Sequence, residues 1–273
     1  MSFFQAVALG VVQGLTEFIP VSSTAHLILV PWLLGWHFEG KVAFVFDVLL
    51  QLGTIAAVVV YFWKDLWAIA RALVRDVRQG TPLASIESRL GAYVVLATLP
   101  AVVAGLSFKR FFEGLHQRPV AVAAILVGAA GLLWSSERVG RRTRALESLT
   151  AMDAFLIGCA QSLALLPGVS RSASTICGGL VLHLARPAAA RFSFLMSIPV
   201  LLAAGALAVK DLVALPGFSS YLPPLAGGFV ASAVVGFVSI HWLLRYLAAH
   251  PLNVFAWYRV VAGGACLIWA LFR

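Results

Sequence analysis

The sequence predicts an all-α polytopic membrane protein, with about six transmembrane helices and two re-entrant helical hairpins arranged as an inverted-topology repeat. Three observations predict this fold. Hydrophobic residues make up 61% of the 273 residues and charged residues only 11%, which is outside the range of an ordinary soluble domain. Several apolar runs have the length of a bilayer crossing, and two polar motifs interrupt shorter ones. The two halves of the chain also repeat each other, within a single membrane domain that covers residues 1–273.

Six apolar runs are long enough to cross a bilayer. A helix rises about 1.5 Å per residue, so about 20 residues match a hydrocarbon core about 30 Å thick. Between two of these runs, the charged residues 64–80 are expected to form an amphipathic or loop segment at the membrane surface. The predicted spans cover residues 43–63, 91–107, 119–135, 188–209, 221–247 and 254–272.

Four further apolar runs are too short to span and form two pairs, each interrupted by polar residues. Backbone that leaves the helix at membrane depth must be buried in protein or line a wet cavity, because lipid cannot satisfy its hydrogen bonds. Both interruptions are therefore predicted to be the tips of re-entrant hairpins. The pairs are residues 2–15 with 25–35, around Glu17 to Thr24, and residues 152–166 with 174–184, around Pro167 to Ser172.

An internal repeat relates the two hairpins. Three short matches occur in the same order at offsets of 148, 148 and 146 residues, which indicates a duplicated unit of one hairpin and three spans, over about 1–135 and about 150–273. Each copy has three crossings, and because this number is odd, the second copy must lie in the membrane with the opposite orientation. Inverted repeats bring their broken helices together near the bilayer midplane. The two tips are therefore predicted to share one site. The matches are Gly10-Val-Val-Gln13-Gly-Leu15 with Gly158-Cys-Ala-Gln161-Ser-Leu163, Val21 to Ala25 with Val169 to Ala173, and Lys64-Asp65-Leu66 with Lys210-Asp211-Leu212.

The formal charge of +9 does not predict a nucleic-acid partner, because the basic residues lie in short connectors between apolar runs. Residues 64–89, 138–144 and 186–191 together with Arg245 hold twelve of them on one side of the predicted fold. Basic connectors favour the cytoplasm, so both chain ends and the mouth of the first hairpin are expected on the outer side. The six basic residues expected there are Lys41, Lys109, Arg110, Arg118, Lys210 and Arg273.

Ionisable residues in the two tips are functional candidates, because a charge at the bilayer centre costs about 2.5–3.5 kcal/mol. The first tip combines Glu17 with Ser23 and His26, and Gln13 lies one helical turn before Glu17. In the second tip, Arg171 stands at the start of a predicted helix whose free N–H groups favour an anion. An arginine can bind a phosphate and stabilise charge that develops during its transfer. Neighbouring hydroxyls come from Ser22, Thr24, Ser170, Ser172, Ser174 and Thr175.

Structural roles are alternatives for several of these residues. Glu17 and Arg171 could form a structural ion pair between the hairpins. Gly10 and Gly14 fit a helix-packing face. Arg259 is expected to extend its side chain to the cytoplasmic interface. The serines Ser22, Ser23, Ser172 and Ser174 could cap helices, and Asp47 and Gln51 are expected to line the cavity or to lie near its outer end.

The chain resembles the bacterial undecaprenyl-diphosphate phosphatases of the BacA (UppP) type. The resemblance implies that the protein hydrolyses undecaprenyl diphosphate to undecaprenyl phosphate and inorganic phosphate. This reaction recycles the lipid carrier for peptidoglycan synthesis and is linked to bacitracin resistance. A multi-pass location in the bacterial inner membrane and an active site open to the periplasmic face are also implied. The resemblance rests on Gln13-Gly-Leu-Thr-Glu17-Phe-Ile-Pro20-Val-Ser22-Ser23-Thr24-Ala-His26 and on Pro167-Gly168-Val-Ser170-Arg171-Ser172-Ala-Ser174-Thr175, in the family's order.

By the same resemblance, Glu17, Ser23, His26 and Arg171 are the catalytic candidates. A divalent metal, Mg²⁺ or Ca²⁺, is implied, with Glu17 and Asp47 as candidate ligands. Many members carry Glu at the position of Gln13, and an amide cannot act as a base or supply charge to the metal. Either Ser23 attacks the terminal phosphorus or it orients a water that does. The candidate substrate-binding residues are Gln13, Ser22, Thr24, Ser170, Ser172, Ser174 and Thr175.

Two other classes of function stay open at this stage. Inverted repeats with broken helices are common in transporters, so the protein could be a prenyl-phosphate transporter or flippase. It could also be a non-catalytic lipid-binding scaffold. The expected partners are a polyprenyl diphosphate lipid and the bilayer itself, and a homodimer is left open as the assembly.

Overall fold

The computed structural model describes residues 1–38, 40–108, 111, 114–115, 117–213 and 218–272. These residues are helical with short connections and contain no strand, only one isolated bridge between Arg144 and Leu184. The helices are α1 (Phe3–Thr16), α2 (Ser23–Leu34), α3 (Gly40–Tyr61), α4 (Trp63–Arg78), α5 (Ile86–Ser107), α7 (Pro119–Gly128), α8 (Ala130–Val139), α9 (Ala151–Ser162), α10 (Arg171–Val181), α11 (Arg186–Val213), α12 (Leu222–Ala249) and α13 (Asn253–Leu271), with the 3₁₀ turns η1 (Leu146–Ser148), η2 (Leu163–Leu165) and η3 (Phe218–Tyr221).

Among the residues that the structure describes, five helical segments are long and apolar enough to cross a membrane, and a sixth is added if α3 and α4, bent by 73°, form one span. The predicted polytopic helical membrane protein is therefore confirmed. The span predicted over 119–135 consists of two helices, α7 and α8, which meet at Ala129. The five segments are Ile86–Ser107, Pro119–Val139, Arg186–Lys210, Ser219–Ala249 and Asn253–Leu271.

Two pairs of short helices, α1 with α2 and α9 with α10, coincide with the predicted interrupted segments. They contain only 14, 12, 12 and 11 residues. Ser22 and Ser170 precede α2 and α10 with φ angles of 75° and 77°, a left-handed conformation that costs a residue with a side chain on the order of 1–3 kcal/mol. Each of these serines accepts a hydrogen bond from the third backbone N–H after it, at 3.4 Å from Ala25 and 3.2 Å from Ala173. The capping role considered for Ser22 is confirmed, whereas α10 is capped by Ser170, which the sequence did not single out as a cap, and Ser23, Ser172 and Ser174 lie inside the helices.

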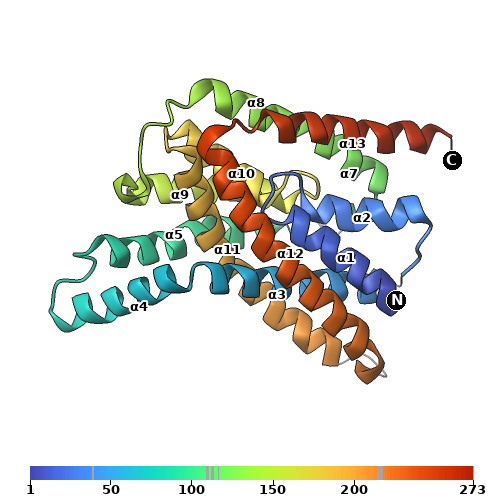
Figure 1. Ribbon diagram of the computed structural model, residues 1–273, viewed down its shortest axis with the longest axis horizontal. Helices are drawn as coiled ribbons and strands as arrows, with labels where there is room; N and C mark the ends of the chain where they lie inside the picture. Colours follow the sequence, from blue (N-terminus) through green and yellow to red (C-terminus); the bar gives the residue numbers. More distant parts are fainter. Residues whose placement is uncertain (39, 109–110, 112–113, 116, 214–217, 273) are drawn as a thin grey trace.

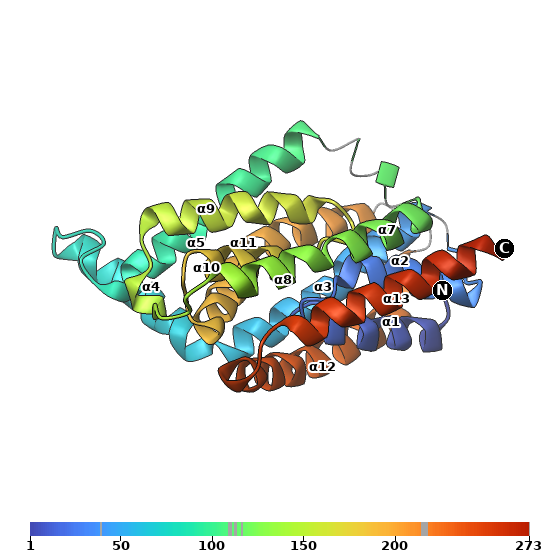
Figure 2. The same ribbon diagram turned by 90° about the horizontal axis from the view of Figure 1, so that it is seen from above.

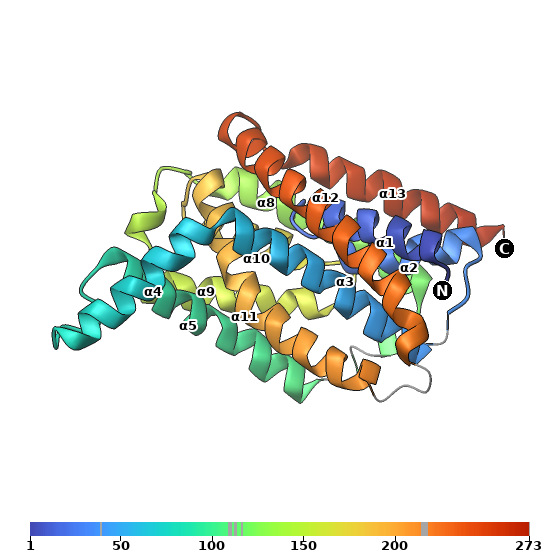
Figure 3. The same ribbon diagram turned by 60° about the horizontal axis from the view of Figure 1, so that its bottom comes forward.

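The first helix of each short pair lies against a long helix from the other half of the chain. Helix α1 packs along α12, and α9 packs along α5. Helix α3 contacts both α11 and α12 near the middle of the molecule (Figure 3), while α13 runs beside α7 and α8 (Figure 2). The largest cluster of buried apolar side chains surrounds the two helix breaks, with Phe18, Ile176, Phe192, Phe194 and Leu243 among its members.

The two ends of the molecule carry different parts of the chain. Helix α1 begins and α13 ends at the right of Figure 1, whereas the turn between α4 and α5 lies at the left. This arrangement agrees with an even number of full crossings between the two chain ends. Of the basic residues counted for the outer side, Lys109, Arg110 and Arg273 lie outside the described residues.

The glycines of α1 allow its backbone to touch α12, as the sequence predicted for a packing face. A Cβ at Gly10 would collide with the carbonyl oxygen of Gly228, and a Cβ at Gly14 would lie 2.8 Å from the backbone nitrogen of Gly236. Helix α9 makes the equivalent approach to α5, because a Cβ at Gly158 would lie 2.5 Å from the carbonyl oxygen of Ala97. Both short helices are thus held against backbone.

Replacing Gly10 by alanine is expected to lower stability, because the added methyl group must push α1 away from α12. Overpacking of this kind costs about 1–3 kcal/mol. Gly131→Ala is the matched control, since nothing lies within 4 Å of a Cβ at that position and alanine favours a helix. Thermal unfolding of both purified variants in detergent measures the difference. Equal melting temperatures would show that the contact between α1 and α12 does not depend on glycine.

Candidate active site

Residues of both polar motifs line one cavity of about 230 Å³. The end of α9, the turn η2 and helices α3, α5 and α11 supply the remaining walls. The apolar side consists mainly of leucine, valine and alanine. The polar side consists of residues at and just before the starts of α2 and α10, with Gln51 from α3 and Gln161 from α9. The lining residues are Glu17, Ser22, Ser23, Thr24, Gln51, Ala101, Gln161, Ala164, Leu165, Leu166, Pro167, Gly168, Ser170, Arg171, Val200 and Leu201.

The carboxylate of Glu17 is the centre of the polar side. Its Oε1 accepts a hydrogen bond from Arg171 Nη2 at 2.9 Å, which is also an ion pair between the two motifs. Its Oε2 accepts from Ser23 Oγ at 2.7 Å and from Gln13 Nε2 at 2.9 Å. Glu17 is only 6% exposed, so these three donors replace the water that a buried carboxylate would otherwise need.

Arg171, the first residue of α10, is held from two sides. Its Nη1 donates to the carbonyl of Ser193 at 2.9 Å, on the opposite side from Glu17. The hydroxyls of Ser193 and Thr175 lie 2.6 Å apart, and Thr175 donates to the carbonyl of Arg171. The third guanidinium nitrogen, Nε, is buried and has no hydrogen-bond partner among the described residues. A buried donor without a partner is unfavourable, and here it lies on a residue that lines the cavity.

Ser23 is placed for proton transfer to a base. Its hydroxyl donates to Glu17 at 2.7 Å, within the range expected of a nucleophile and its general base. Thr24 also lines the cavity, as do the capping residues Ser22 and Ser170.

Four predicted substrate-binding residues do not line the cavity, namely Gln13, whose amide instead donates to Glu17, and three hydroxyl residues of α10. Ser172 is fully buried, with its hydroxyl 3.1 Å from that of Ser170. Ser174 donates to the carbonyl of Ser170 at 2.8 Å, and Thr175 contacts Ser193 as described. These three hydroxyl side chains lie behind the wall, where they fix the first turn of α10.

His26 is not in contact with Ser23. Its Nδ1 lies 2.8 Å from the carbonyl of Ser22, and its Nε2 lies 2.8 Å from the hydroxyl of Tyr258 on α13. A carbonyl can only accept, so Nδ1 carries a proton and the neutral imidazole accepts from Tyr258. The two rings also stack. Both ring nitrogens are therefore engaged, and Glu17 is the base in contact with Ser23.

Arg259 does not extend to the membrane interface, and the expectation from the sequence was wrong. Its side chain is fully buried and donates to three backbone carbonyls, those of Pro20 at 2.9 Å, Val169 at 2.8 Å and Ala129 at 3.2 Å. Two of these carbonyls belong to the polar motifs, and the third lies between α7 and α8. The helix breaks leave these carbonyls in need of donors, which places the guanidinium inside the protein.

Amide oxygens, and not a cluster of acids, are the additional oxygen donors near Glu17. Within the described ranges, no group of three or more His, Cys, Asp or Glu residues could hold a metal ion. Asp47 does not line the cavity, whereas Gln51 and Gln161 do. Gln161 is 2% exposed, and within the described part of the chain its Oε1 has no hydrogen-bond partner, as is true of Gln13 Oε1. The internal repeat pairs these two glutamines, but no signal in the sequence marked Gln161 as a site residue.

Comparisons with known proteins agree over almost the whole chain. A sequence model of the family described as bacitracin resistance protein BacA matches residues 6–265. A protein of Chlorobium phaeovibrioides named undecaprenyl-diphosphatase is 44% identical, over 96% of this chain and 95% of its own length. Proteins with the same name from Gloeobacter violaceus and Gemmatimonas aurantiaca are also 44% identical, over 98% and 96% of this chain and 91% and 96% of their own lengths.

Arg259→Met is expected to destabilise the protein, because it leaves three buried carbonyls without a donor at about 1 kcal/mol or more each. Arg259→Lys should retain part of this stability. Arg245→Met, a change at an exposed arginine of α12, is the control and should change little. Thermal unfolding of the three variants in one detergent makes the comparison. A loss no larger for Arg259→Met than for Arg245→Met would contradict a role in joining the two motifs.

Proposed function

This chain belongs to the BacA family, and we propose that it uses the cavity between its two polar motifs to hydrolyse undecaprenyl diphosphate. The protein is a membrane undecaprenyl-diphosphatase, which leaves undecaprenyl phosphate and inorganic phosphate. The product is the lipid carrier of peptidoglycan precursors, so the reaction serves cell-wall synthesis. A prenyl-phosphate transporter is not favoured, because the relatives are named for the phosphatase reaction.

The contact of one carboxylate, Glu17, with both a hydroxyl and a guanidinium is the observation that supports this site most directly. The guanidinium of Arg171 matches a phosphate group. Its Nε is free, and its Nη2 can exchange Glu17 for a phosphate oxygen of the substrate. Binding of the diphosphate would then release Glu17 Oε1 and leave Oε2 on Ser23. In the absence of substrate, Glu17 is thus the partner of the Arg171 guanidinium, which is the group that receives the phosphate.

In the proposed reaction, Ser23 Oγ bonds to the terminal phosphorus while the bond from that phosphorus to the bridging oxygen breaks. The proton of Ser23 passes to Glu17 Oε2, and undecaprenyl phosphate leaves with the electron pair of the broken bond. Water then attacks the phosphoserine, the bond to Oγ breaks, Glu17 returns the proton to Ser23, and inorganic phosphate leaves. Arg171 and the N-terminus of α10 stabilise charge on the transferred group.

The apolar side of the same cavity suits the prenyl chain. Leu165, Leu166, Val200 and Leu201 line it next to the polar residues. A lipid whose phosphates face Arg171 can therefore extend its first isoprene units along these side chains.

His26 has a positioning role in this proposal, because it connects the backbone of Ser22 to Tyr258.

A divalent metal, Mg²⁺ or Ca²⁺, fits the oxygen donors near Glu17. Such ions bind carboxylate and amide oxygens, and Mg²⁺ takes many of its ligands from substrate phosphates and water. Glu17 and the unpartnered Oε1 of Gln161 would hold it. When bound, the metal would offset charge on the diphosphate. The position of Asp47 outside the cavity lining does not support it as a ligand.

We also propose that the two short helix pairs are re-entrant hairpins related by an inverted repeat, within one domain of two units over about 1–135 and 150–273. Three similarities support this. The helix breaks share a left-handed serine, the following helices share the same cap, and α1 meets α12 as α9 meets α5. The twelve basic residues then face the cytoplasm and the cavity opens to the periplasm. A homodimer stays a prediction.

Glu17→Gln is expected to reduce the kcat of phosphate release at least a hundredfold, because it removes both the base and the charge facing Arg171. The assay measures inorganic phosphate released from undecaprenyl diphosphate by purified protein in detergent, where no transport can occur. Glu147→Gln, at an exposed carboxylate, is the control and should keep full activity. Near-normal release by Glu17→Gln would exclude this site.

Ser23→Ala separates the two candidate nucleophiles. If Ser23 forms the covalent bond, acid-quenched wild-type enzyme should contain phosphoserine at this position by mass spectrometry, and the alanine variant should lose most of its turnover. Ser135→Ala, a change at an exposed serine whose hydroxyl bonds within its own helix, is the control. Substantial turnover by Ser23→Ala, without any phosphoserine in the wild type, would assign the attack to water.

A further inference from the structure

Helix α4 connects α3 to the candidate span that begins at Ile86. The helix α3 ends at Tyr61, α4 leaves it with a bend of 73°, and the next span begins at Ile86. A helix in this position remains at the level of the lipid headgroups, because both neighbouring spans reach the membrane surface there. The surface segment expected over residues 64–80 is therefore a continuous helix, and it packs against the beginning of α5.

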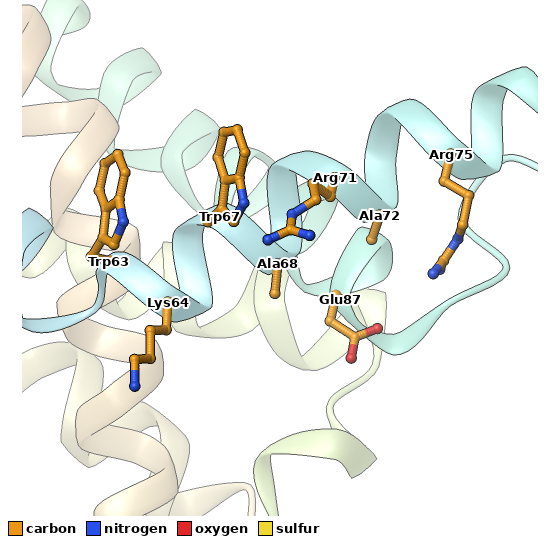
Figure 4. Close-up of a pocket in the computed structure, with 8 residues that line it drawn as sticks. All are labelled: Trp63, Lys64, Trp67, Ala68, Arg71, Ala72, Arg75 and Glu87. Atoms are coloured by element: carbon orange, nitrogen blue, oxygen red, sulfur yellow. The ribbon is translucent and has the colours of Figure 1, made fainter.

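A pocket of about 380 Å³ lies along α4 and the first turn of α5 (Figure 4). Trp63 and Trp67 stand one helical turn apart, with their rings nearly parallel and their centroids 6.3 Å apart. They are 59% and 50% exposed. The guanidinium of Arg71 lies 5.1 Å from the centre of the Trp67 ring. The lining residues are Trp63, Lys64, Trp67, Ala68, Arg71, Ala72, Arg75 and Glu87.

The pocket has an excess of positive charge. The acids of α4 already have partners, since Asp65 pairs with Arg191 at 3.1 Å and Asp76 accepts hydrogen bonds from Ser85 and Ser88. Of the pocket's own cations, Arg75 pairs with Asp76. In the part of the chain that the structure describes, Lys64 and Arg71 have no carboxylate partner.

Glu87 is the one acid that lines the pocket. It lies in the first turn of α5, where a negative charge stabilises the positive end of the helix. This role accounts for its presence next to three cations. With Glu87 counted, the pocket still has more positive than negative side chains.

We propose that this pocket binds the phosphate of an anionic phospholipid headgroup. Exposed tryptophans are typical of the membrane interface, and basic residues on an amphipathic helix attract anionic lipids. Lys64 and Arg71 would contact the phosphate, and Trp63 and Trp67 would lie beside the glycerol and the first acyl carbons. Free inorganic phosphate would make only the first of these contacts.

The test measures phosphatidylglycerol and phosphatidylcholine binding to the purified full-length protein by native mass spectrometry. Phosphatidylglycerol should bind more tightly than phosphatidylcholine. Arg71→Gln should weaken phosphatidylglycerol binding about fivefold, and Lys64→Gln with Arg71→Gln about 25-fold, as expected for removal of one and two interfacial charges. Arg78→Gln is the matched control, because Arg78 is an exposed arginine of the same helix outside the pocket. Phosphatase activity of each variant verifies that it is folded.

Three results would overturn the proposal. Equal affinity for the two lipids would mean that the headgroup charge is not recognised. An equal loss of phosphatidylglycerol affinity in Arg71→Gln and in Arg78→Gln would mean that the helix attracts lipid only through its total charge. Release of bound phosphatidylglycerol by inorganic phosphate at concentrations equal to those of the lipid would identify a free-phosphate site.

Discussion

The need to satisfy backbone groups at the two helix breaks is the constraint on which the rest of the structure depends. A helix that stops inside a membrane leaves carbonyl and N–H groups without water to bind. Ser22 and Ser170 supply acceptors to the helices that follow the breaks, and Arg259 supplies donors to the carbonyls of Pro20 and Val169. With these partners in place, two segments of the chain can place polar side chains at the centre of the protein.

The charges at the site are balanced before any substrate arrives. Glu17 is a buried acid whose one charged partner among the described residues is Arg171, and these two residues lie 154 positions apart in the sequence. Removing either partner would leave the other as a buried unpaired charge, which is costly. In the proposed reaction, a diphosphate entering the cavity would bring its own negative charge to Arg171, so the same balance would be kept while Glu17 is released for proton transfer.

Much of the fold was predictable from the sequence, because apolar length and the positions of prolines, glycines and charges determine where a chain can cross lipid. The meeting of Glu17 with Arg171 was also expected, from the repeat. The position predicted for the Arg259 side chain was wrong, because its hydrogen-bond acceptors are carbonyls from three distant segments that no side-chain pattern reveals. The partner of His26 and the unpaired oxygen of Gln161 depend in the same way on packing between distant helices.

The crossed packing of the two halves has a consequence for biosynthesis. Helix α1 leaves the ribosome well before α12, whose backbone it touches and which begins at Leu222. At roughly 5–20 residues per second, translation of the intervening chain takes on the order of 10–40 s. During that interval the first polar motif lacks α12 and Arg259, and for most of it Arg171 as well. The early chain must therefore be sheltered by the insertion machinery, or wait at the membrane surface, until its second half is made.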